Sequence, residues 1–260
     1  MAARIRLDQL LVQRSLAPSR ERAQALILAG AVRVDGEVAD RAAAPVSDAV
    51  AITIAAGPRF VSRGGEKLDA ALDELGIDPT GAVVLDVGSS TGGFTDCLLQ
   101  RGAVRVYAID VGRGQLDWKL RTDPRVIARE GVNAREGFDL PERVDLIVAD
   151  VSFISLRIAL PPSFRHLREG GDVVALVKPQ FEAGREAVGR GGIVRDAKDR
   201  AAATIAVCEA FTAAGVGTVG IVPSRLPGRE GNHEIFVHCR QGEPGLAPGR
   251  IRERAAEAAE

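Results

Sequence analysis

The chain has 260 residues, of which 46% are hydrophobic and 27% charged, a composition typical of folded globular proteins that excludes a collagen-like or largely disordered chain. Its 34 basic and 35 acidic residues nearly cancel, so any nucleic-acid binding requires a local basic patch. No apolar run approaches the ~18 residues that span a bilayer, and the three cysteines lack metal-ligand spacing. We therefore expect a cytoplasmic protein without metal or membrane contact, with its cysteines in the core.

Residues 1–55 are expected to form a small α+β domain. Apolar residues at helical spacing predict two short helices, one from Leu7 and one after the N-cap Ser19. Alternating residues around Asp35-Gly36 predict a tight hairpin, and the apolar run 50–54 predicts a further strand.

Arginines gather in this domain, where residues 1–34 hold six of them against two acids. Two stand in the first turn of the second predicted helix, where the helix dipole does not favour a cation, so a phosphate partner explains them better than helix stability. Solvated surface arginines are the alternative. The residues predicted to contact RNA are Arg4, Arg6, Arg20, Arg22 and Arg33.

The run SRERAQALILAGAVRVDG resembles the S4 RNA-binding domain, whose signature is Ser-Arg, a short apolar helix, a glycine and a Val-x-Val-x-Gly hairpin. The resemblance implies binding of structured ribosomal RNA through its shape and backbone.

The larger domain is predicted at 63–242, after a linker at 56–62 and before a C-terminal tail at 243–260 that is either a short charged helix or disordered. Strand and helix patterns alternate in it, which predicts an α/β fold with a doubly wound, mostly parallel, seven-stranded Rossmann-like sheet. The expected strands lie at 83–88, 104–110, 126–128, 145–150, 172–178, 216–222 and 234–237.

The stretch 83–97, VVLDVGSSTGGFTDC, combines a buried strand, a glycine-rich turn and the start of a helix. A dinucleotide fingerprint needs glycine where Ser90 stands, and a P-loop needs a Lys-Ser/Thr pair that is missing. The turn therefore favours a nucleoside without phosphates, of which S-adenosylmethionine is the commonest; an ordinary loop is the alternative. The glycines are expected to let the ligand approach the backbone closely.

Two residues after later strands suit a nucleoside. Asp110 ends the second strand, where a carboxylate accepts hydrogen bonds from both ribose hydroxyls; a helix N-cap is the other interpretation. The amide of Asn133 suits an adenine edge. The residues predicted to contact the cofactor are Asp86, Gly88, Ser89, Ser90, Gly92, Gly93, Phe94, Asp110, Asn133 and Asp150.

Four charged residues are predicted to meet at the carboxyl edge of the sheet. Asp150 and Lys178 each end a parallel strand there. Glu234 reaches the same edge if the last strand is antiparallel, and Lys67 stands near the start of the helix that precedes the first strand. Unrelated surface ion pairs are the alternative.

The large domain resembles the FtsJ-type ribose 2′-O-methyltransferases, whose active site is a Lys-Asp-Lys-Glu tetrad. The contexts EKL, VADVSFIS, LVKPQFE and GNHEIFV match it at Lys67, Asp150, Lys178 and Glu234. Together with the S4 module, the chain from Arg4 to Arg240 is similar to the TlyA family of ribosomal RNA 2′-O-methyltransferases, which are historically also labelled haemolysins. The segment 58–61 lacks a tryptophan expected in some relatives.

This resemblance implies S-adenosylmethionine-dependent 2′-O-methylation of a cytidine in small- or large-subunit ribosomal RNA. It assigns Lys178 as the base or the group that orients the hydroxyl, Lys67 and Glu234 as orienting residues, and Asp150 to a place between methyl donor and acceptor. We expect ribosomal subunits as partners and a monomer.

Three other functions are opposed by parts of the sequence. The sequence contains no spanning segment of the kind that a membrane-lytic protein uses. It has the complete tetrad, which a non-catalytic assembly factor does not need, and Ser90 interrupts the fingerprint expected of a dehydrogenase. Phe153 and Phe181 are candidates to stack a flipped base. Core packing is the favoured alternative for Phe153.

Overall fold

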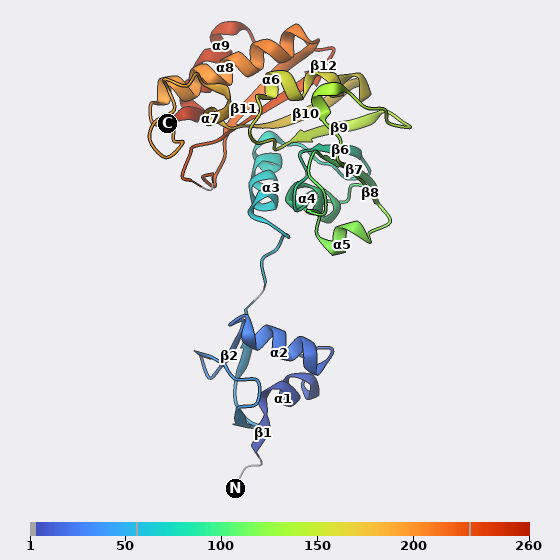
Figure 1. Cartoon of the computed structure of the whole chain (residues 1–260), viewed down its shortest axis with the longest axis vertical. Coiled ribbons are helices and arrows are strands. Elements are labelled where there is room, and N and C mark those ends of the chain that lie inside the picture. Colours follow the sequence, from blue (N-terminus) through green and yellow to red (C-terminus); the bar gives the residue numbers. More distant parts are fainter. Residues whose placement is uncertain (1–3, 56, 229) are drawn as a thin grey trace. The chain divides into compact units, whose positions relative to one another are not determined.

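The computed structural model describes residues 4–55, 57–228 and 230–260 (Figure 1). The chain divides into two compact units, Met1–Arg59 and Phe60–Glu260. The division falls inside the segment 56–62.

The first unit is a small α+β domain around one apolar core. Its described elements are β1 (Arg4–Arg6), α1 (Leu7–Gln13), α2 (Arg20–Leu28), β2 (Val32–Val34), β3 (Glu37–Val38), β4 (Pro45–Ser47) and β5 (Ile52–Ile54). Leu7, Leu11 and Ile27 are buried in the core. Asp35 and Gly36 both have positive φ angles, 50° and 90°, as the predicted hairpin requires. The pairing of β1 with β4 escaped prediction because three-residue strands carry little pattern.

The second unit is built on a seven-stranded sheet in the order β11-β12-β10-β9-β6-β7-β8. Strand β12 pairs antiparallel with both neighbours, whereas the pairs among β10, β9, β6, β7 and β8 are parallel. The strands are β6 (Val83–Val87), β7 (Arg105–Asp110), β8 (Val126–Glu130), β9 (Val144–Ala149), β10 (Leu167–Val177), β11 (Val216–Pro223) and β12 (Ile235–Gln241). This confirms the predicted α/β fold class.

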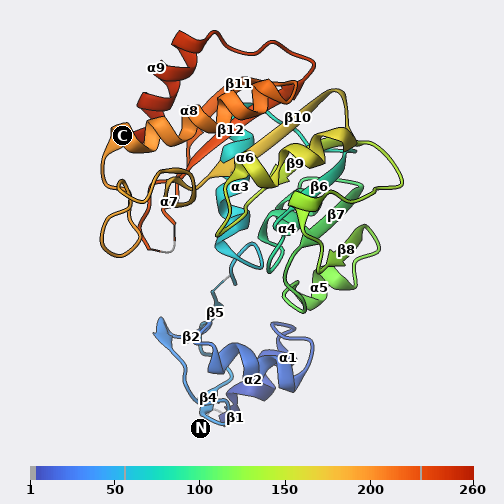
Figure 2. The ribbon, with the colours of Figure 1, turned by 45° about the horizontal axis from the view of Figure 1, so that its top comes forward.

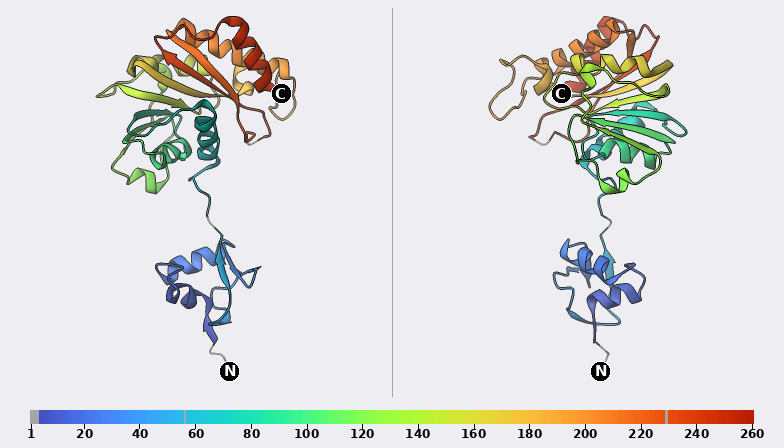
Figure 3. Two further views of the ribbon diagram at one scale, coloured as in Figure 1. Left: turned by 180° about the vertical axis from the view of Figure 1, so that it is seen from behind. Right: turned by 45° about the vertical axis from the view of Figure 1, so that its right-hand side comes forward.

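Helices cover both faces of this sheet, so the unit has three layers (Figures 2 and 3). One face packs against α3, α4 and α5 and the other against α6, α8 and α9, each over its own apolar core. The helices are α3 (Arg63–Leu75), α4 (Gly93–Gln100), α5 (Trp118–Arg121), α6 (Leu156–Ala159), α7 (Pro179–Glu182), α8 (Ala197–Ala213) and α9 (Pro248–Ala259), with 3-10 turns at Ala134–Glu136 and Pro161–His166.

Two elements differ from the expectation. Helix α3 begins at Arg63 rather than Leu68, because its first turn contains two glycines that weaken the helical signal. The segment 243–260, expected as a short charged helix or a disordered tail, contains helix α9, which packs on the core through the buried Ile251 and Ala255 instead of lying free. The carbonyl of Ala259 accepts a hydrogen bond from the buried Arg200 guanidinium at 2.9 Å.

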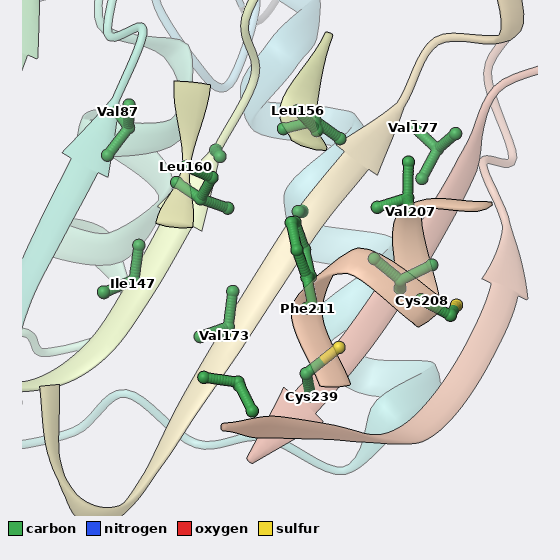
Figure 4. Close-up of a cluster of buried hydrophobic side chains, with 14 of the residues drawn as sticks. Val87, Ile147, Leu156, Leu160, Val173, Val177, Val207, Cys208, Phe211 and Cys239 are labelled. Atoms are coloured by element: carbon green, nitrogen blue, oxygen red, sulfur yellow. The ribbon is translucent and has the colours of Figure 1, made fainter. Parts of the chain in front are cut away.

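Replacement of Phe211 by alanine is expected to lower the free energy of unfolding of the large unit by about 3–5 kcal/mol. Figure 4 shows this fully buried ring on α8 among the strand residues of one core, and it meets Phe164 edge-on at 5.1 Å. Denaturant unfolding of the full chain measures the loss. The exposed Val104→Ala serves as control and should change stability by less than about 0.5 kcal/mol. If Phe211→Ala lowered the free energy of unfolding by less than about 1 kcal/mol, neighbouring side chains would have to move into the cavity that the ring leaves.

Candidate active site

A cleft of about 1350 Å³ opens at the carboxyl edge of the sheet. It is lined from the start of α3, the turn after β6, the ends of β7, β9 and β10 and the loop before β12. Sites for one small ligand commonly occupy about 300–1000 Å³. The cleft therefore has room for a cofactor and a nucleotide together.

All four predicted catalytic residues line this cleft, as two ion pairs. Lys67 Nζ lies 2.5 Å from Glu234 Oε2, and Lys178 Nζ lies 2.7 Å from Asp150 Oδ1. Lys178 also donates to Ser152 Oγ at 2.8 Å. The antiparallel course of β12 brings Glu234 to the edge, as predicted.

Burial sets the electrostatics of the first pair. The side chains of Lys67 and Glu234 are 10% and 3% exposed. Burial raises the pKa of the Glu234 carboxyl, whereas Lys67 and then Lys178 act to lower it and Asp150 acts to raise it. The ionisation of Glu234 is therefore sensitive to all three other members of the set.

Asn232, which no sequence pattern singles out, hydrogen-bonds the loop before Glu234 to the loop around Gly192 and Val194. Its amide is buried; Oδ1 accepts from Val194 N at 3.0 Å and Nδ2 donates to Gly192 O at 2.9 Å. Gly228 passes so close that a Cβ there would lie 2.6 Å from Glu234 Oε1.

The glycines after β6 have a packing role in addition to the predicted contact with the cofactor. A Cβ on Gly88 would meet the Asp150 carbonyl oxygen at 2.9 Å, one on Gly92 would meet Leu120 at 2.2 Å, and one on Gly93 would meet Ser62 Oγ at 2.2 Å. Neighbouring protein atoms thus already favour glycine at these three positions, and Gly88 and Gly93 also line the cleft. Gly92 is not among the described residues that line the cleft.

Asp110 lines the cleft and hydrogen-bonds to both the turn after β6 and the loop after β7. Its Oδ2 accepts from Ser90 N at 2.8 Å and its Oδ1 from Gly112 N at 2.7 Å. Each oxygen retains a lone pair for a ribose hydroxyl. It is not the N-cap of a helix. Ser90 takes a left-handed φ of 48°, and the neighbouring Gln115, a lining residue missed from the sequence, lies 3.4 Å from its Oγ.

Asn133 and Phe94 line the cleft but are engaged elsewhere. The Asn133 amide caps the following 3-10 turn, where its Oδ1 accepts from Arg135 N at 3.3 Å. Its Nδ2 donates to Glu136 Oε1 at 2.7 Å, so the predicted contact to adenine competes with these bonds. Phe94 is 3% exposed and stacks on Phe236 in the core. Ser89 lines the cleft as expected.

Asp86 lies beneath the turn, fully buried, and is not among the described lining residues. Its Oδ2 accepts from Thr95 Oγ1 at 2.6 Å, and its Oδ1 has no hydrogen-bond partner in the described chain. Burial raises the pKa of Asp86 to about 7, with smaller contributions from Asp150 and Asp110. Three interacting carboxylates suit a positively charged ligand, which S-adenosylmethionine is.

Phe153 does not pack in the core, so the favoured expectation for it was wrong. It is 91% exposed, lines the cleft and takes a left-handed φ of 65°, which is unusual for a bulky residue. Its ring lies 5.2 Å from that of Phe181, which also lines the cleft. The two rings form an aromatic pair at the mouth of the charged site.

The predicted RNA-contacting arginines lie on the first unit, and all five are exposed. Arg6 and Arg20 both reach the buried Asp8, at 2.9 and 3.2 Å. The hydrogen bond from Arg6, and others from Gln24 and Arg20, hold the pKa of Asp8 well below its usual range.

The other three arginines differ in their contacts. Arg33 donates to the Gly36 carbonyl at 3.0 Å. Within the part of the chain that the structure describes, Arg4 and Arg22 have no ion-pair partner. Their charge is free for another molecule.

Comparison with known proteins matches both units to established families. A model of the FtsJ-like methyltransferases matches residues 60–241, and a model of the S4 domain matches residues 5–49. The chain is 49% identical to the 16S/23S rRNA (cytidine-2′-O)-methyltransferase TlyA of Mycobacterium tuberculosis, over 92% of this chain and 91% of that protein.

Two further relatives extend the match. The 23S rRNA (cytidine-2′-O)-methyltransferase TlyA of Campylobacter jejuni is 37% identical, over 69% of this chain and 70% of that protein. A solved structure from Streptococcus thermophilus, which bears a provisional hemolysin name, is 38% identical with a TM-score of 0.73, over 99% of this chain and 96% of that chain.

Affinity for S-adenosylmethionine is expected to fall as the pH drops below about 7, by up to tenfold per pH unit, because a cationic ligand favours ionised Asp86, whose pKa burial raises to about 7. Calorimetry between pH 6 and 8, in buffers of different ionisation enthalpy, measures affinity and proton release. Asp86→Asn should remove the slope; an equal slope in this variant would contradict the assignment.

The same group has the opposite effect on the stability of the free protein. Its folded pKa lies above its ordinary value of 3.8, so the folded state holds the proton between pH 3.8 and about 7 and the unfolded state does not. The contribution of Asp86 to the free energy of unfolding therefore decreases as the pH rises through that window.

Proposed function

The chain belongs to the TlyA family of FtsJ-like methyltransferases, and from this premise we propose that it transfers a methyl group from S-adenosylmethionine to the 2′ oxygen of a cytidine in ribosomal RNA. The family resemblance inferred from the sequence is confirmed by these matches. The observation that carries the proposal is the convergence of Lys67, Asp150, Lys178 and Glu234 in one cleft beside the turn after β6.

When bound, S-adenosylmethionine would supply an electrophilic methyl carbon, which the 2′ oxygen would attack in line with the breaking bond to sulfur, so that the sulfonium leaves as a neutral thioether. The protein's task is alignment, which can lower a barrier by about 7–11 kcal/mol. Lys178 holds the 2′ oxygen; its ammonium orients the hydroxyl, and only its neutral amine can take the proton. Asp150 anchors Lys178, and the buried Lys67–Glu234 pair orients the nucleotide.

The aromatic pair Phe153 and Phe181 stacks the target base. A nucleotide within a helix must leave the stack to reach a cleft, and aromatic faces stabilise the flipped base. The exposure of Phe153 beside Lys178 supports this role.

The S4 unit holds the RNA through Arg4, Arg6, Arg20, Arg22 and Arg33, whose guanidinium groups suit phosphates. The proposed partners are ribosomal subunits in the cytoplasm. The Mycobacterium tuberculosis relative is named for RNA of both subunits and the Campylobacter jejuni relative for that of the large subunit alone, so both subunits are to be tested. No helix among the described residues is long and apolar enough to cross a membrane.

Methyl transfer is tested with tritiated S-adenosylmethionine and separate small and large subunits lacking 2′-O-methylation. Wild-type protein should transfer tritium to the RNA of at least one subunit. Mapping of that RNA should locate the label on a 2′-O-methylcytidine. Lys178→Ala should lose at least about 100-fold in single-turnover rate, because the nucleophile is no longer held in line, while keeping cofactor and RNA affinity.

The two arms answer different questions. Absence of labelling by wild-type protein on either subunit would refute the proposed function. A near-normal single-turnover rate in Lys178→Ala would refute only the role given to that residue.

Replacement of Arg22 by alanine should weaken RNA binding and reduce the slope of log affinity against log salt by about 1, because one phosphate contact is lost. Binding titrations at several salt concentrations measure this. Arg252→Ala, an exposed arginine on α9 of the other unit, is the matched control and should leave the slope unchanged. An unchanged slope in Arg22→Ala would remove it from the RNA-binding set.

A further inference from the structure

Helix α7 carries a buried carboxylate, Glu182, that the proposed mechanism does not use. It lies one turn beyond Lys178, and its side chain is 1% exposed. A buried carboxylate is costly unless it is fully hydrogen-bonded, so its partners indicate what it holds. All of its side-chain partners belong to the segment that follows Asp150.

Both oxygens of Glu182 are occupied. Oε1 accepts from Leu156 N at 2.6 Å; Oε2 accepts from Ser155 Oγ at 2.5 Å and from Arg157 Nε at 3.3 Å. The Ser155 hydroxyl in turn accepts from Arg157 N at 3.2 Å. Burial raises the pKa of Glu182, and these donors oppose that shift. With both oxygens engaged and hardly any exposure, the carboxylate does not reach a substrate.

These bonds complete a series of contacts between the segments that follow β9 and β10. The first contacts join Lys178 to Asp150 at 2.7 Å and to Ser152 at 2.8 Å. Next come the rings of Phe153 and Phe181, 5.2 Å apart. The hydrogen bonds of the buried Glu182 side chain are the last contacts in this series.

One residue between these contacts, Phe153, has a backbone conformation that its surroundings must stabilise. Phe153 has a left-handed φ of 65°, a conformation that side-chain-bearing residues rarely adopt, and its ring is 91% exposed rather than held by core packing. Such a conformation persists only where the surroundings impose it. The loop is fixed before Phe153 by Asp150 and after it by Glu182.

We propose that Glu182 is a positioning residue for methyl transfer, which fastens loop 150–155 to helix α7 and so holds Phe153 and Lys178 in register. The inference rests on the proposed function, since it assumes that these groups align the nucleotide. It assigns Glu182 an effect on turnover rather than on cofactor affinity.

The test compares Glu182→Ala and Glu182→Gln with wild-type protein, measuring kcat at saturating RNA and cofactor, the Kd for S-adenosylmethionine and the Tm. We expect kcat to fall about 10- to 100-fold in Glu182→Ala, as for a misplacement near 1 Å, with a change of less than about twofold in cofactor Kd. Glu182→Gln keeps one acceptor oxygen for Leu156 N and should lose less.

The matched control is Asp172→Asn. Asp172 is a partly buried carboxylate in the middle of β10, away from Lys178, where it accepts from His238 and Arg240. Its loss should lower Tm while leaving kcat within about twofold of wild type. A folded Glu182→Ala with wild-type kcat, or a kcat loss no greater than that of Asp172→Asn, would overturn the proposal.

A double-mutant cycle with Phe153→Ala separates positioning from general destabilisation. If Glu182 acts through the loop, the two losses, expressed as activation free energies, are not additive, whereas the losses from independent effects add. If Glu182→Ala does not fold, Ser155→Ala, which removes a single donor to Oε2, replaces it in the cycle. Failure of wild-type protein to methylate RNA would refute the proposed function; additive losses in active proteins would refute only this inference.

Discussion

The pairing of opposite charges at one sheet edge is the constraint on which the large unit depends. Glu234 is almost completely removed from water, and a carboxylate in such surroundings is tolerable only with a close cation. Lys67 provides it from a helix 167 residues earlier in the chain. The start of α3, the edge of β12 and the loop between β11 and β12 must therefore converge, and the cleft is the space left between them. Loss of one partner would leave a buried charge alone, so the two pairs restrict the fold as well as serving the chemistry.

Much of this arrangement follows from the sequence, because parallel strands that end in charged residues place them at a common edge. Asp150 and Lys178 could be located in this way, and Glu234 needed only the direction of the last strand. The sequence did not reveal which neighbours a glycine touches. Gly92 and Gly93 resemble ligand-binding glycines in a pattern, and the structure adds that they pack against Leu120 of α5 and Ser62, the residue before α3. Such contacts depend on tertiary packing that a local pattern does not contain.

The aromatic and amide side chains illustrate the same limit. A phenylalanine is usually buried, so the sequence favours core packing over base stacking for Phe153; its left-handed backbone, visible only in the structure, turns it outward. Asn133 and Asn232 are chemically identical in the sequence. One caps a local turn and the other joins two loops around the cleft, and only the partners distinguish them. In the S4 unit, the ion pairs of Arg6 and Arg20 with the buried Asp8 are likewise visible only in the structure.

The position of β12 has a consequence for how the protein is made. This strand is the last of the sheet to be synthesised, yet it lies between β10 and β11, so the edge of β10 stays unpaired until residue 241 has emerged from the ribosome. Glu234 arrives with the same segment. The complete set of four charged residues therefore exists only once this segment has been synthesised, and the cleft is complete only when β12 has inserted between β10 and β11.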